Sequence, residues 1–355
     1  MKESLKIAGA FVGVIVGAGF ASGRELLLMF VDFGVWGLLG SVVSATLFIF
    51  LGMALAGMGS RLRAKSHKDV VHALCGRYLG TFVDLMITFF MFAVTVVMLA
   101  GGGALLEQQF GIPALFGSAG VTLIVVAIVC LDVKKVIGMI GAVTPLLVLT
   151  AAGVALYGVA TRGLSFGELN QLASQQDPGA SHWLLGALLY VSYNIVAGVP
   201  FLAIMGGAAK SEKQAIWGGI FGGALLGLLM LVMSLGLLSR LDSVADLPMP
   251  MLSIATEVSP ALGLLMALII FLMIVNTAVG TLYSFSARLL PAGTRTFRIG
   301  SAAFGALAFA GSLVGFVSLV GQVYPLFGYL GFLLIGAVVV GWLRVGGLWL
   351  ASNGR

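Results

Sequence analysis

Charged side chains are scarce in this sequence. Only 9% of its 355 residues are Asp, Glu, Lys or Arg, whereas 60% are hydrophobic. A soluble domain needs a much larger charged surface, so this composition excludes an ordinary soluble protein. Apolar runs of roughly 20 residues, enough for a helix to cross a bilayer, predict an all-α polytopic membrane protein. The start, MKESLKIAG, lacks the pattern of a cleaved signal peptide, so we expect the first apolar segment to be retained.

Cysteine and histidine are also rare. The two cysteines, Cys75 and Cys130, fall on the cytoplasmic side of the predicted topology, where a disulfide is not expected. The three histidines lie outside the apolar segments, and the sequence shows no metal cluster, catalytic triad or phosphate-binding loop. These absences argue against an enzyme and an ATP-driven pump. The net charge of +6 is explained by basic loops that orient the chain, so no nucleic-acid partner is expected.

Lysine and arginine give the orientation of the predicted spans. With the N-terminus in the cytoplasm, all but three of the 19 basic residues fall in cytoplasmic segments; Arg162 and Arg240 lie outside and Arg24 within the first span. This positive-inside bias predicts cytoplasmic N- and C-termini. The ten predicted spans cover about residues 6–31, 35–58, 80–105, 113–131, 136–160, 183–207, 214–238, 260–286, 298–316 and 319–343.

The parity of the spans predicts the architecture. Five spans that begin inside end outside, so the sixth begins outside, and two five-span units of one fold would be inverted relative to each other. We expect a first repeat at 1–161, an external loop at 162–182, a second, inverted repeat at 183–343 and a cytoplasmic tail at 344–355. Asp246–Glu257, with two prolines near its start, is interpreted as a short external helix over the substrate pathway.

The first span contains Gly17–Gly19 near its middle. Glycine is unfavourable inside a helix, and open backbone at membrane depth is tolerated only where it faces protein or a wet cavity. We therefore predict two half-helices around a binding site, where free N–H groups would bind a substrate carboxylate and free carbonyls would bind Na⁺. The alternative is close helix packing, because Gly9, Gly13 and Gly17 share one face.

The sixth span carries a polar patch at an equivalent depth. Ser192, Tyr193 and Asn194 lie within a stretch that ends at Gly198-Val199-Pro200. Interrupted segments at matching places in two halves point to a site at the bilayer midplane, so we predict a second break here. The alternative is that these side chains form hydrogen bonds between helices.

The eighth span offers oxygen ligands for a cation. Asn276 and Thr277 lie at its centre, and Thr281 follows one turn later. Together with the carbonyls of Gly13 and Val16, these oxygens would form a Na⁺ site, because hard cations prefer oxygen. Ordinary hydrogen bonds between helices are the alternative.

Arg24 and Glu25 are costly at membrane depth unless they are paired or hydrated. We interpret them as an outer gate, with Gln322 as a partner of Arg24 across the pathway. The alternatives are a static ion pair and a proton-carrying role for Glu25. Asp84, near the inner end of the third span, is expected to form an interfacial salt bridge.

Three motifs carry a resemblance: VGAGFASGRELL at Val16–Leu27, SYN at Ser192–Asn194 and NTAVGTLYS at Asn276–Ser284. With the ten-span layout, they resemble the YkvI-type bacterial membrane proteins, which are similar to the amino acid–polyamine–organocation transporters of LeuT-type fold. The resemblance implies alternating access around broken first and sixth helices in the bacterial inner membrane. It places substrate contacts at Gly17, Ala18, Gly19, Phe20, Ser192, Tyr193 and Asn194, and Na⁺ at Gly13, Val16, Asn276, Thr277 and Thr281.

These expectations converge on a Na⁺-coupled symporter of a small amino acid or related zwitterion. The fifth span has no lysine of the kind used by proton-coupled relatives, which favours Na⁺, and the lack of an acidic residue at either break favours a solute with a carboxylate. The alternatives are a proton-coupled transporter, an exporter of small amines or organic solutes, a channel and a non-transporting membrane sensor. The expected partners are a small-molecule solute and the lipid bilayer.

Overall fold

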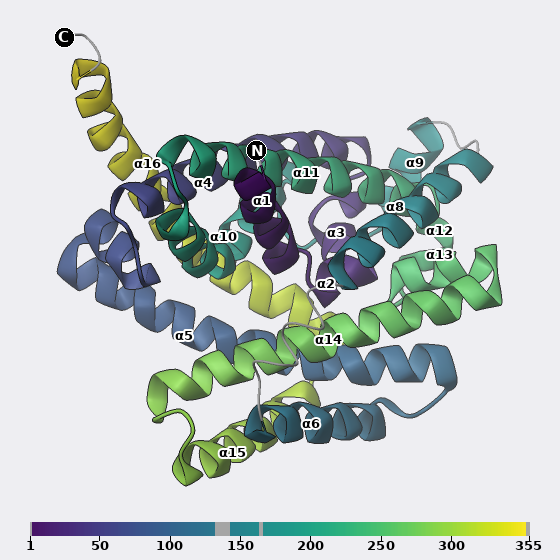
Figure 1. Ribbon diagram of the computed structural model, residues 1–355. Helices are drawn as coiled ribbons and strands as arrows, with labels where there is room; N and C mark the ends of the chain where they lie inside the picture. Colours follow the sequence, from purple (N-terminus) through teal and green to yellow (C-terminus); the bar gives the residue numbers. More distant parts are fainter. Residues whose placement is uncertain (1, 132–142, 163–165, 353–355) are drawn as a thin grey trace.

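A computed structural model of the protein describes residues 2–131, 143–162 and 166–352, and the secondary structure in these ranges is helical, without a strand (Figure 1). Seven of the described helices are long and apolar enough to cross a membrane, which makes the chain a multi-pass membrane protein. They are α4 (Val35–Arg61), α5 (His67–Phe110), α6 (Ala114–Leu131), α10 (Trp183–Ala208), α11 (Glu212–Leu238), α14 (Pro260–Leu289) and α16 (Phe316–Ser352).

The other predicted spans correspond to shorter helices, so the fold is compatible with ten spans. The first span is divided into α1 (Lys2–Ile15), α2 (Ala18–Ser22) and α3 (Arg24–Met29). The fifth and ninth correspond to α8 (Val143–Thr161) and α15 (Arg295–Ser312), although the predicted start of the fifth span, at 136–142, lies outside the described residues. Short elements connect the spans: η1 (Val31–Phe33), α9 (Phe166–Ala173), α12 (Leu241–Val244) and α13 (Pro250–Val258).

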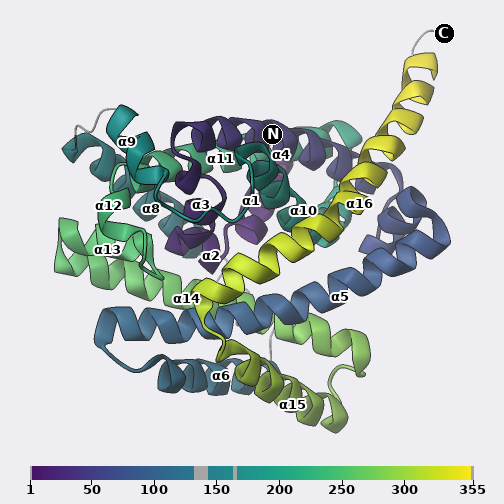
Figure 2. The same cartoon turned by 180° about the vertical axis from the view of Figure 1, so that it is seen from behind.

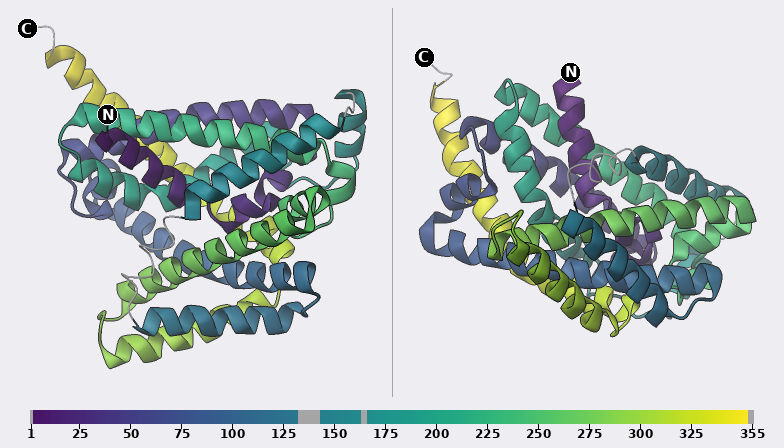
Figure 3. Two further views of the ribbon diagram at one scale, coloured as in Figure 1. Left: turned by 45° about the vertical axis from the view of Figure 1, so that its right-hand side comes forward. Right: turned by 60° about the horizontal axis from the view of Figure 1, so that its bottom comes forward.

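The helices form two packed groups, which Figures 2 and 3 show as two layers. In one group, α1 and α10 pack with α4 and α11, while in the other α5, α6, α14 and α15 pack together, and α16 contacts α10 and α5. Glycines allow the closest approach: a Cβ atom at Gly219 of α11 would overlap the backbone of Gly52 on α4. Large apolar side chains such as Leu123 and Phe116 remain 72% and 67% exposed, as expected of lipid-facing helices.

Two accessory helical segments flank the spans. The basic segment after the second span forms the first turns of α5, which is capped by Ser66 and Asp69 and kinked at Gly76, where φ is +68°. The expected helix in Asp246–Glu257 is present as α13, which ends one residue beyond that segment. The predicted cytoplasmic tail begins as a helix, because α16 continues to Ser352.

Candidate substrate and cation site at the interrupted first helix

The first helix is interrupted where the sequence predicts. α1 ends at Ile15, Gly17 adopts extended backbone with φ −90° and ψ −171°, and α2 begins at Ala18. The second part turns again, because Gly23 is left-handed with φ +83° and only then does α3 begin. This angle favours glycine, and a Cβ atom here would lie 2.9 Å from Cγ of Met251 on α13. Helix α13 therefore packs directly on the broken span.

The sixth span is not broken, and the predicted interruption at Ser192–Asn194 is wrong. α10 is helical throughout, with Pro200 inside it. The polar side chains have partners within the protein: Ser192 donates to the carbonyl of Gly328 on α16 at 2.6 Å, and the amide of Asn194 donates to the carbonyl of Tyr190 at 3.0 Å. Ser192 thus forms the bond between helices that was the alternative interpretation, and Asn194 bonds within its own helix.

Glu25 lies at the break, although the sequence suggested that neither break has an acidic residue. The left-handed turn at Gly23 folds α3 back over α2, so that a Cβ atom at Gly19 would overlap Oε1 of Glu25. Tyr193 on α10 donates a hydrogen bond of 2.8 Å to Oε2, and Glu25 is only 6% exposed. The expectation of no acidic residue at the break was wrong because the sequence does not show the fold of the chain. Glu25, six positions after Gly19, is brought back into contact with Gly19 by the turn at Gly23.

Tyr324 is a member of this site that the sequence analysis did not single out. Its hydroxyl lies near the Glu25 carboxylate, and its ring stacks on that of Tyr193 with centroids 4.8 Å apart. Tyr190 meets Tyr193 edge to face at 5.4 Å. The signal that could have found it is a tyrosine followed by a proline, Tyr324-Pro325, within the apolar tenth span. Phe20, predicted as a substrate contact, is 2% exposed on α2.

The expected Na⁺ ligands lie on both sides of the break. In a continuous helix the N–H of Gly17 would bond to the carbonyl of Gly13. Here it bonds to the carbonyl of Ile15 at 2.8 Å, so the Gly13 carbonyl is released from this bond. Thr277 of α14 faces this point, since its Oγ1 lies 3.8 Å from the Cβ position of Gly17. Val16 is buried beside the break and Asn276 is partly buried. These neutral oxygens fit a monovalent cation, whereas Thr281 bonds to Thr277 and Thr95.

Arg24 and Gln322 do not form the expected contact. Nη1 of Arg24 donates to the carbonyl of Ala245 at 2.6 Å, and Gln322 is exposed. Arg24 and Glu25 do not form an ion pair with each other in the described ranges. The static ion pair that was considered as an alternative is therefore not present there. Arg24 instead links α3 to the segment that leads into α13.

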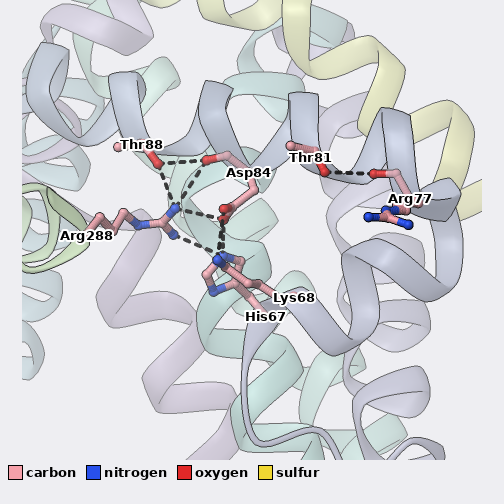
Figure 4. A network of polar contacts seen from close by, with 7 residues as sticks. All are labelled: His67, Lys68, Arg77, Thr81, Asp84, Thr88 and Arg288. Carbon is pink, nitrogen blue, oxygen red and sulfur yellow. Dashed lines mark hydrogen bonds and ion pairs between the residues drawn. The ribbon is translucent and has the colours of Figure 1, made fainter.

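The predicted interfacial salt bridge of Asp84 is part of a larger polar network between α5 and α14 (Figure 4). Arg288 of α14 donates to Oδ1 of Asp84 at 2.8 Å and to the hydroxyl of Thr88 at 2.7 Å. His67 and Lys68, in the first turn of α5, also contact the Asp84 carboxylate, at 2.8 and 3.3 Å. The network borders a cavity of about 300 Å³ between α5, α10 and α14.

Comparisons with known proteins agree with this architecture. No protein-family model matches the chain. The uncharacterized membrane protein YkvI of Bacillus subtilis (strain 168) is 32% identical over 340 residues, 94% of each chain.

Solved transporter structures share the fold at low sequence identity. An inward-facing structure of Mhp1 is 14% identical, covers 96% of this chain and 77% of its own, and has a TM-score of 0.66. MhsT in complex with L-phenylalanine is 16% identical, covers 92% and 86%, and also has a TM-score of 0.66. A Na⁺-coupled sialic acid symporter is 14% identical, covers 94% and 78%, and has a TM-score of 0.56. These neighbours are transporters rather than enzymes. The chain therefore belongs to the YkvI family of membrane proteins and has the LeuT-type transporter fold.

Proposed function

We propose that this protein is a secondary active transporter that carries a small amino acid or related zwitterion together with Na⁺. The observation that supports this most is the interruption of the first helix opposite Thr277. An interrupted helix at membrane depth supplies backbone groups to a solute or ion, which a continuous helix cannot do. The released carbonyl of Gly13 and the hydroxyl of Thr277 are neutral oxygens, the ligand type that Na⁺ requires. Na⁺ would couple transport by binding here together with the solute.

Alternating access requires that a pathway to the site open toward each side of the membrane in turn. At one end, α13 packs on Gly23, and the Gln108 side chain bonds to both the N–H and the carbonyl of Met249, at 2.9 and 3.0 Å. A hollow of about 300 Å³ lies near that end beside Glu107 and Pro248, and another of the same volume borders Tyr283 and Arg288 at the opposite end. A hollow toward each end supports a pathway that opens to one side at a time. We place the protein in the bacterial inner membrane with both termini cytoplasmic, as the basic loops indicate.

The test is uptake by proteoliposomes under an inward Na⁺ gradient. Radiolabelled amino acids of graded side-chain size serve as substrates, and K⁺ replaces Na⁺ at constant pH as the control. Accumulation that requires Na⁺ is the expected result. Uptake that is equal in K⁺ would rule out Na⁺ coupling, and no accumulation under either gradient would argue against a transporter.

A proton-coupled transporter is a second candidate, favoured by the burial of Glu25 beside Tyr193. A carboxyl group inside the membrane that can exchange a proton is a common element of such carriers. In that case an inward proton gradient would drive uptake in place of the Na⁺ gradient. Glu25→Gln would then abolish the response of uptake to the proton gradient, while exchange of solute across the membrane would remain intact.

A further inference from the structure

The Glu25 carboxylate is enclosed by aromatic side chains on two helices. Tyr193 of α10 donates to Oε2, and the ring of Tyr324 of α16 stacks on that of Tyr193. Both tyrosines are 3% exposed. Oε1 lies against Gly19 of α2, one of the predicted substrate contacts. The acid therefore has one oxygen held by Tyr193 and the other beside a predicted substrate contact.

This arrangement has the chemistry of an ammonium site. A carboxylate at membrane depth is stabilised by a positive partner, and a protonated amine supplies both the charge and N–H donors. An anion would meet the carboxylate in a region of low dielectric and would be repelled.

The N-terminal end of α2 offers much less for a substrate carboxylate. α2 has only five residues, and Oε1 of Glu25 already occupies the space beside Gly19. The structure thus gives no built site for a negative group at the place where the sequence suggested one. The charge that the protein itself presents at the break is negative.

We infer that Glu25 binds the protonated amine of the transported solute, so that the substrate class is defined by an amino group and a carboxylate is optional. This inference rests on the proposed function, since it assigns the substrate class to the same site. Tyr193 is a positioning residue, because it holds Oε2 and thereby keeps Oε1 beside Gly19. Gly19 is required because any side chain there would displace the carboxylate.

The experiment measures thermal stabilisation of the purified protein by matched probes, since a ligand that binds the folded state raises the unfolding temperature. Ethylamine is L-alanine without its carboxylate, and propionate is L-alanine without its amino group; 3-methylbutylamine and 4-methylpentanoate relate to L-leucine in the same way. In the wild-type protein we expect stabilisation by the amino acid and the amine of a set, and none by the acid. This preference needs no variant and would be overturned by an acid that binds as tightly as its amine.

Variants assign the preference to Glu25. We expect Glu25→Gln to weaken amine binding tenfold or more, Glu25→Asp to weaken it less, and Tyr193→Phe to lower affinity while the preference for amine over acid remains. Glu3→Gln is the matched control, because Glu3 pairs with Lys6 near the N-terminus, far along the chain from the break. Unchanged amine affinity in Glu25→Gln with loss of the response to a pH gradient would overturn the inference and identify a proton carrier.

The two proposals fail in different ways. Na⁺-driven uptake of an amino acid with amine binding that does not depend on Glu25 would leave the proposed function standing and overturn the inference. Amine binding that is lost in Glu25→Gln, in a protein that moves no solute in liposomes, would support the inference and contradict the transporter assignment.

Discussion

Oγ1 of Thr277 lies 3.8 Å from the position that a Cβ atom would take on Gly17. Two spans that are far apart in the sequence therefore face each other at the point where the first helix is interrupted. The N–H of Gly17 bonds to the carbonyl of Ile15, so the Gly13 carbonyl has lost its usual partner. Such a pair of neutral oxygens is the basis of the Na⁺ proposal.

Replacement of Thr277 tests this pair. Thr277→Ala removes a hydroxyl ligand worth about 1.4 kcal/mol, so the Na⁺ concentration for half-maximal uptake should rise about tenfold. Thr277→Ser keeps the oxygen and should stay near the wild-type value. Thr46→Ala is the control, because the Thr46 hydroxyl bonds only within its own exposed turn. Na⁺ titration of uptake in proteoliposomes provides the measurement, and equal Na⁺ dependence of all four proteins would contradict the site.

Gly19 should not tolerate a side chain, because a methyl group there overlaps Oε1 of Glu25. We expect Gly19→Ala to reduce uptake tenfold or more by displacing the carboxylate. Gly9 lies in α1 with open space around its Cβ position, so Gly9→Ala should retain uptake within about twofold. Initial rates measured at equal protein density compare the two variants. A Gly19→Ala protein with normal rates would show that the carboxylate does not need this space.

Helix α13 should pack less tightly when Gln108 is truncated. Its amide satisfies both backbone groups of Met249, so Gln108→Ala should lower the free energy of unfolding by about 1–3 kcal/mol. Gln322→Ala is the matched control, because Gln322 is exposed. Thermal unfolding in detergent, together with the rate of proteolysis near α13, reports the effect. If both variants had the unfolding temperature and proteolysis rate of the wild type, Gln108 would not be the residue that holds α13 in place.

Asp32 should make stability depend on pH. It lies in η1, between the first two spans, where burial raises its pKa to about 7, although Arg24 opposes the shift and Asp177 adds to it. The pKa of an unfolded-chain aspartate is about 3.9, so the folded state binds the proton more tightly. The resulting stability is fully present below about pH 4 and is lost as the pH rises through about 7.

Asp32→Asn tests this dependence. Asparagine does not ionise, so the variant should lack this pH-dependent loss and should exceed the wild type by about 2–4 kcal/mol at pH 8, with a smaller difference at pH 5. Unfolding temperatures measured between pH 4 and 8 give the comparison. Parallel profiles for the two proteins would show that Asp32 does not titrate with folding.

The sequence by itself determined the class of the protein, its predicted orientation and the interruption at Gly17. These follow from local properties: apolar run length, the distribution of basic residues, and the cost of consecutive glycines in a helix. The accessory helix α13 was also predictable, since its prolines and its amphipathic pattern are local signals.

Only the tertiary structure decided which polar residues share the site. Ser192 and Asn194 resemble a helix break in the sequence, but Gly328 and Tyr190 accept their hydrogen bonds and α10 stays intact. Glu25 returns to Gly19 because Gly23 turns left-handed, and Tyr324 comes from the last span. A sequence pattern records the cost of a polar group at membrane depth, but its partner is chosen by the packing of helices that are far apart along the chain.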